Sequence, residues 1–135
     1  KLGVHICVCG PKELWPDEEF LTVVREVASI SGGSITVTDN VEESVKEADV
    51  LYTDVWASMG QEEEAEQRKA IFKDYQINDD IMAVANDGAM VLHCLPAHRE
   101  EEITGKVFEE HANEIFDEAE NRLHAQKAVL VKAMI

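Results

Sequence analysis

The fold is decided by the stretch AMVLHCLP, residues 89–96, in which an apolar run leads directly into polar residues and a proline. Short apolar runs of this kind are typical of buried strands in parallel sheets. A second run, VLYTD at residues 50–54, repeats the arrangement upstream and leads into the loop VWASMG. Each run therefore places polar side chains at the carboxyl end of a strand, where open α/β sheets bind their ligands.

Other strands and helices alternate around these two runs. Further strands are predicted at residues 4–9 and 35–38, with a last short strand at 115–117. Helices are predicted at 17–30, after the cap residue Asn40, at 61–69, from the cap residue Asn78 to about 86, at 105–110 and at the C-terminus. This alternation indicates an α/β fold, a Rossmann-like three-layer sandwich with a mostly parallel sheet, in a single domain of residues 1–135.

The composition excludes several classes of protein. The chain is 45% hydrophobic and 30% charged, and no apolar run approaches the roughly 20 residues that span a bilayer. The formal net charge is −16, and acidic runs at 62–66 and 100–102, which we interpret as solvated surface, carry much of it. Such a surface repels nucleic-acid phosphates. We therefore expect neither a membrane nor a nucleic-acid partner.

Cys7, Cys9 and Cys94 are the cysteines of the chain, and they make no disulfide framework, which favours a reducing compartment. Cys7 and Cys9 lie two residues apart on one predicted strand, so both point to one face, and we expect them to be buried in the sheet. His93, Cys94 and His98 are too few, and too unlike the usual ligand spacings, for a structural zinc site. No metal is expected.

The polar residues after the two strands suit a substrate that carries an amine. Asp54 can hold an ammonium group, Ser58 can donate a hydrogen bond, and Cys94 offers a titratable thiol beside His93. Each also has a plain structural interpretation: Asp54 as the cap of a turn, Cys94 as a buried thiol and His93 as a core histidine. One residue at a time, both interpretations stay open.

Three motifs favour the substrate-binding interpretation. They are D-x-x-x-S-M-G at residues 54–60, HCLP at 93–96 and DEAENR at 117–122. In this order and context they resemble the second, ornithine-binding domain of the ornithine carbamoyltransferases, and the resemblance covers essentially the whole chain.

The resemblance implies that the carbamoyl group of carbamoyl phosphate passes to the δ-amine of L-ornithine, giving citrulline and phosphate. It implies no cofactor, a homotrimer when the enzyme is intact, and a cytoplasmic location, or the mitochondrial matrix in a eukaryote. Asp54, Cys94 and Arg122 are the catalytic residues that it implies, with Cys94 orienting the δ-ammonium as a thiolate. The implied substrate-binding residues are these three together with Ser58, Met59, His93 and Leu95.

The resemblance also predicts what is missing. The family's carbamoyl phosphate-binding domain, and the first strand–helix unit of its second domain, have no counterpart in the sequence. The missing strand belongs between the strands at 4–9 and 50–54, so we predict a gap in the sheet there and an inactive isolated chain. The family shares Leu-Pro in its catalytic loop, and we predict a cis peptide bond between Leu95 and Pro96.

Two other interpretations remain. If the chain were a complete gene product, a non-catalytic α/β module that binds an amino acid, or an interaction domain, would gain ground. Mapping the native N-terminus by intact mass would decide between these and a fragment. A nucleotide-binding Rossmann domain is disfavoured because no Gly-x-Gly-x-x-Gly follows the strand at 4–9. The sequence does not distinguish a biosynthetic from a catabolic enzyme.

Overall fold

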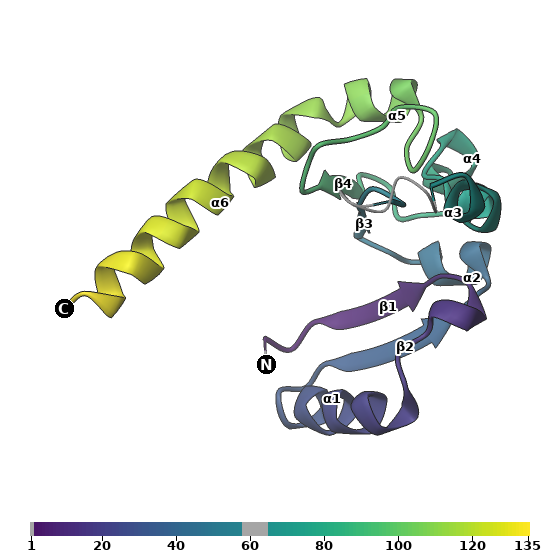
Figure 1. Cartoon of the computed structure of the whole chain (residues 1–135). Coiled ribbons are helices and arrows are strands. Elements are labelled where there is room, and N and C mark those ends of the chain that lie inside the picture. Colours follow the sequence, from purple (N-terminus) through teal and green to yellow (C-terminus); the bar gives the residue numbers. More distant parts are fainter. Residues whose placement is uncertain (1, 58–64) are drawn as a thin grey trace.

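In the described part of this α/β fold, the strands form two separate parallel pairs (Figure 1). The computed structural model describes residues 2–57 and 65–135. In it, β1 (His5–Cys9) pairs with β2 (Ser34–Thr38), and β3 (Val50–Thr53) pairs with β4 (Met90–His93). The described parts of β1 and β3 do not pair with each other, which confirms the predicted gap in the sheet.

Four of the described α-helices begin at a residue whose side chain caps them, whereas the C-terminal helix begins without a side-chain cap. Asp17 accepts a hydrogen bond from Phe20 N at the start of α1, and Asn40, Asn78 and Thr104 do the same for α2, α4 and α5. The α-helices are α1 (Glu18–Ile30), α2 (Val41–Val45), α3 (Ala65–Phe72), α4 (Asp79–Met82), α5 (Gly105–Glu110) and α6 (Ala112–Ala133). Two short 3₁₀ helices, η1 (Lys12–Leu14) and η3 (Lys73–Tyr75), complete the described elements.

The hydrophobic core lies around the β3–β4 pair. Val91, Ile103 and Ile115 are completely buried there, and Val107 and Phe108 of α5 join the same cluster. The β1–β2 pair is more open, although α1 packs on β2. The two pairs therefore differ in how much of their apolar surface the fold covers.

A cavity of about 480 Å³ lies between the two pairs of strands. Its lining includes Cys7 and Cys9 of β1, Leu51 and Thr53 of β3, and Asp54. Cys7 is exposed and Cys9 half-buried, so the prediction that both are buried in the sheet is wrong. The reason is that β1 has no described strand on the edge opposite β2, so its side chains border open space.

Helix α6 is the longest helix, and only its first part is packed. Ile115 is buried where α6 lies against β4, whereas every residue from 121 to 135 is exposed. Figure 1 shows α6 extending away from the rest of the molecule. The predicted strand at 115–117 is wrong, because these residues continue α6 and place Ile115 in the core.

Two predicted helices differ from the observed ones. The helix after Asn78 ends at Met82 rather than near 86, since Asn86 instead binds the Glu47 carbonyl and the Asp49 carboxylate through its side chain. The helix predicted at 61–69 is described only from Ala65, because residues 58–64 lie outside the described part. No described helix has the length and apolar character needed to cross a bilayer.

Candidate active site

The loops after β3 and β4 meet at the carboxyl end of the second strand pair. Thr53 is the register partner of His93, so the next residues along, Asp54 and Cys94, leave the sheet side by side. The side-chain donor atoms of Asp54, His93 and Cys94 all lie within 4.8 Å of one another. The structure thus brings together the two strand ends that the sequence singled out.

The Cys94 thiol lies in an environment that disfavours its ionisation. Its pKa is raised, chiefly by partial burial and also by a hydrogen bond with the Asp54 carboxylate, while Tyr52 acts in the opposite direction. These contacts favour the thiol form of Cys94, and the expected thiolate, which would face a substrate ammonium, stays a prediction. Tyr52, a β3 residue that the motifs did not single out, has its own pKa raised by burial and by contact with Cys94.

The backbone turns sharply after Cys94. The Leu95–Pro96 peptide bond is cis, which confirms the prediction. Leu95 itself has φ of 56°, in the left-handed region that costs a residue with a side chain about 1–2 kcal/mol. Its N–H donates to Nδ1 of His93 over 3.0 Å, and this bond holds the turn.

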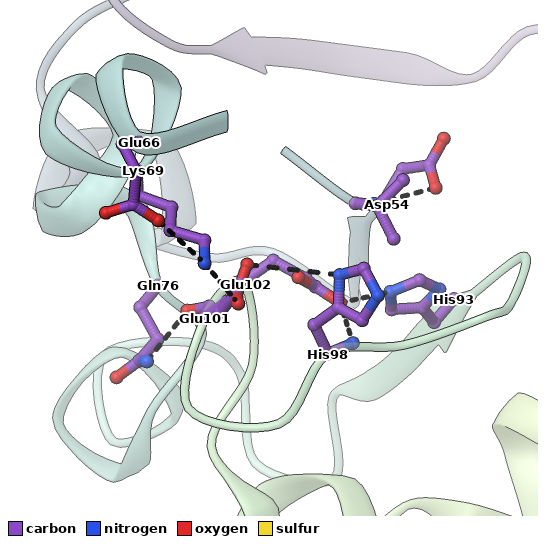
Figure 2. A network of polar contacts seen from close by, with 9 residues as sticks. Asp54, Glu66, Lys69, Gln76, His93, His98, Glu101 and Glu102 are labelled. Carbon is purple, nitrogen blue, oxygen red and sulfur yellow. Dashed lines mark hydrogen bonds and ion pairs between the residues drawn. The ribbon is translucent and has the colours of Figure 1, made fainter. Parts of the chain in front are cut away.

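The His93 ring lies beneath this turn and has protein partners on both nitrogens. Nε2 lies 2.9 Å from Oε1 of Glu102, and both side chains are completely buried (Figure 2). The same Oε1 accepts a hydrogen bond of 2.6 Å from the backbone N–H of His98. In this structure the ring supports the loop from below and offers no free nitrogen to a substrate.

Glu102 corrects the interpretation of the acidic run at 100–102 as solvated surface. Its side chain is buried, and only its position opposite His93 in three dimensions reveals this. Burial raises the pKa of a carboxyl, but the hydrogen bonds from His93 and from the His98 backbone outweigh it, so the pKa of Glu102 is lowered. Glu102, like Tyr52, is a residue of this site that sequence reasoning missed.

Arg122 reaches the same loop from α6. Its Nη1 donates to the Cys94 carbonyl oxygen over 3.0 Å, and the rest of the side chain is exposed. A guanidinium has five donors in a planar fork, so further N–H groups remain for an oxyanion beside Cys94. Of the other expected site residues, Leu95 lies in the loop itself, whereas Ser58 and Met59 lie outside the described residues.

Among the residues that the structure describes, two clusters of side chains have the donor types of a metal site. One is Asp54, His93 and Cys94, and the other is His98, Glu101 and Glu102. In the first, His93 already uses both ring nitrogens within the protein. In the second, the Lys69 ammonium lies 3.0 Å from Glu101 and supplies a positive charge of its own. Neither geometry adds a reason to expect a resident metal.

Comparison with known proteins identifies the family of the chain. Residues 1–133 match the model of the aspartate/ornithine carbamoyltransferase Asp/Orn-binding domain. The chain belongs to that family. In this carbamoyltransferase domain, Asp54 and Cys94 lie next to each other at the carboxyl ends of β3 and β4.

Among its relatives is the anabolic ornithine carbamoyltransferase of Pyrococcus furiosus, 48% identical over 134 residues, which are 99% of this chain and 42% of that protein. The ornithine carbamoyltransferase of Methanosphaera stadtmanae is 48% identical over 129 residues, which are 96% of this chain and 43% of that protein. The crystal structure of the anabolic enzyme from Campylobacter jejuni superposes with a TM-score of 0.90 at 40% identity, covering 96% of this chain and 43% of that one. The chain thus spans less than half the length of these relatives.

Proposed function

We propose that this chain is the ornithine-binding part of an ornithine carbamoyltransferase, with residues 1–135 as one domain. The observation that carries the proposal is the meeting of Asp54 and Cys94 at the carboxyl ends of β3 and β4, with Arg122 bound to the same loop. An anion, a thiol and a guanidinium around one point suit an amine that attacks a carbonyl carbon.

Asp54 binds the substrate's ammonium group in this proposal. Its Oδ1 accepts a hydrogen bond from Val55 N over 2.7 Å, which orients the carboxylate, and the side chain is exposed to a ligand. A charge-assisted hydrogen bond to an ammonium is worth about 1.5–3 kcal/mol. Ser58 and Met59, from the loop that follows, hold the rest of the amino acid.

The attacking nitrogen must lose a proton before it forms the new C–N bond. The environment of Cys94 favours its thiol form, but a cationic amine beside it would favour loss of the thiol proton to solvent. The resulting thiolate orients the ammonium and then accepts the proton that the nitrogen must lose. As the C–N bond forms, negative charge develops on the carbamoyl oxygen; when the C–O bond breaks, the carbonyl re-forms and phosphate leaves with the charge and the second proton of the nitrogen. The free donors of Arg122 stabilise the charge on the carbamoyl oxygen, and the Leu95 carbonyl accepts from the carbamoyl amide.

The rest of the enzyme supplies what this domain does not. Carbamoyl phosphate is bound by the family's other domain, the intact enzyme is a homotrimer without a cofactor, and its location is the cytoplasm or the mitochondrial matrix. Its products feed arginine biosynthesis or the urea cycle. By the same reasoning the isolated chain, with its few arginines, forms no citrulline.

A hybrid enzyme tests the proposal. In it, residues 1–133 of this chain replace the matching segment of the Pyrococcus furiosus relative, and citrulline formation from ornithine and carbamoyl phosphate is measured. The control hybrid carries the matching segment of the Methanosphaera stadtmanae relative, which has the same 48% identity to this chain. We expect both hybrids to be active. A folded hybrid that binds ornithine but forms no citrulline, beside an active control, would favour a non-catalytic amino-acid-binding module.

A further inference from the structure

Glu102 is a carboxylate in a place where carboxylates are rarely found. Its side chain is completely buried, beneath the loop that carries Cys94. A buried charge is tolerated only where hydrogen bonds compensate it. Oε1 is compensated by His93 and His98, but Oε2 is buried without a hydrogen-bond partner in the described structure. A group held at this cost calls for an explanation beyond packing.

The backbone at Glu102 is a rigid support. Its carbonyl accepts from Ile77 N over 2.9 Å, and Thr104 N donates back to the Ile77 carbonyl over 3.0 Å. Ile103, the next residue, is completely buried in the core. The carboxylate therefore projects from a fixed point of the β3–β4 core toward the loop (Figure 2).

The hydrogen bonds around His93 define its tautomer. The N–H of Leu95 points at Nδ1, so Nδ1 must be an unprotonated acceptor. The ring proton of neutral His93 is then on Nε2, where it is donated to Glu102 Oε1. The carboxylate is a pure acceptor, so it favours this tautomer and disfavours the alternative, in which Nε2 would face it with a lone pair.

We propose that Glu102 is a positioning residue for the carbamoyl transfer: through His93 it fixes the backbone of Leu95, and through His98 it fixes the far end of the loop. Cys94 lies between His93 and Leu95, and its carbonyl is the acceptor for Arg122. One buried oxygen atom thus determines where the thiol, the Leu95 carbonyl and the Arg122 guanidinium lie. The inference rests on the proposed function and assigns Glu102 and His93 indirect roles in it.

The hybrid enzyme allows the inference to be tested with graded variants. Glu102→Gln keeps one oxygen that can accept from both His93 and His98, so kcat should fall by no more than about tenfold, the difference between a charged and a neutral acceptor. Glu102→Asp keeps the charge but withdraws the oxygen by one methylene, and kcat should fall about 100-fold because the loop is misplaced. Glu102→Ala should lose at least as much.

The matched control is Glu110→Gln on the exposed surface of α5, where only an ion pair with Lys106 is lost. The ornithine KM should change much less than kcat in the Glu102 variants, because Asp54 is untouched. If Glu102→Ala does not fold, the Asp and Gln variants carry the comparison. Equal losses in folded Glu102→Asp and Glu102→Gln, or kcat unchanged in Glu102→Asp, would overturn the inference.

A second readout is independent of catalysis. NMR of isotope-labelled histidine reports which ring nitrogen of His93 carries the proton, with the signal assigned by its loss in His93→Gln. We expect Nε2–H in the parent hybrid and in Glu102→Gln, and a mixture of tautomers in Glu102→Asp. If the parent hybrid forms no citrulline, the proposed function fails, and this measurement still decides the inference: an unchanged tautomer in Glu102→Asp would overturn it.

Discussion

The two strand pairs of this molecule have the same parallel topology, but they differ in burial and in the site residues that they carry. Each is a parallel pair connected through helices, yet β3–β4 contributes the buried residues Leu51, Val91 and His93 while Ile6 of β1 is 49% exposed. The candidate active site lies at the end of the β3–β4 pair, because Asp54, Cys94, His93 and Glu102 all lie on this pair or against it. Chemistry that needs fixed geometry is placed where side chains are immobilised by packing.

The largest effect should come from the core of the buried pair. Ile103→Ala should lower the free energy of unfolding by about 2–5 kcal/mol, because the site is closed on all sides and a cavity remains. The matched change Ile6→Ala on β1 should cost within about 1 kcal/mol, since that side chain is already half in solvent. Urea unfolding of both variants measures the difference. Equal losses would mean that the two pairs are equally well packed in solution.

The next effect concerns substrate binding at the end of β3. Asp54→Asn in the hybrid enzyme should lower kcat/KM for ornithine by about 10–100-fold, because a charge-assisted hydrogen bond to the ammonium is lost. Asp74→Asn on η3, away from the strand ends, is the control and should leave kcat/KM unchanged. An unchanged value for Asp54→Asn would remove Asp54 from the site.

Protonation of Glu102 in acid should lower the free energy of unfolding. Burial raises the pKa of this carboxyl, but the bonds from His93 and His98 outweigh burial and leave the folded-state pKa below its unfolded value. The ionised form therefore stabilises the fold above the unfolded pKa of about 4.3, and this contribution is lost as pH falls through the lowered folded value. The difference in unfolding free energy between the parent chain and Glu102→Gln, which does not titrate, should vary with pH only in that acidic window. A constant difference from neutral pH to below the window would contradict it.

The smallest effect distinguishes the cysteines of the two pairs. From the sequence alone we expect Cys94 to be the reactive thiol and Cys7 and Cys9 to be inert, but the exposure of Cys7 revises this order. Alkylation should label Cys7 fastest, and Cys9 and Cys94 more slowly because burial raises the pKa of both thiols. In the hybrid enzyme, an ornithine analogue should slow labelling of Cys94 and leave Cys7 unaffected. Protection of all three by the analogue would point to a general tightening instead.

The features that the sequence predicted well depend on short stretches of neighbouring residues. The caps at Asn40 and Asn78 start helices where expected, because the hydrogen-bonding capacity of a cap residue can be read directly from the sequence. The cis Leu95–Pro96 bond was predicted from the proline and from the family resemblance.

What the sequence did not reveal depends on contacts between distant segments. Ile115 and Phe116 have strand-forming side chains, but packing of Ile115 on the core keeps them in a helix. Glu102 stands in an acidic run that looks solvated, and only His93, nine positions away, makes it a buried acceptor. The position of Cys7 fits the alternating pattern of a strand, but its exposure depends on whether another strand lies beside β1 on the edge opposite β2.

Ile115 is the buried residue of α6, and the far half of the helix is exposed. A tilt of α6 would therefore pivot at Ile115. Arg122 lies about 10 Å beyond Ile115 along the axis and Ala133 about 27 Å beyond it, at 1.5 Å per residue. If the helix tilts about Ile115, the displacement at Arg122 is therefore roughly a third of the displacement at the tip, in proportion to these axial lengths. A swing of several ångströms at the tip would become a displacement of about 1 Å at the guanidinium, enough to break its 3.0 Å bond to the Cys94 carbonyl.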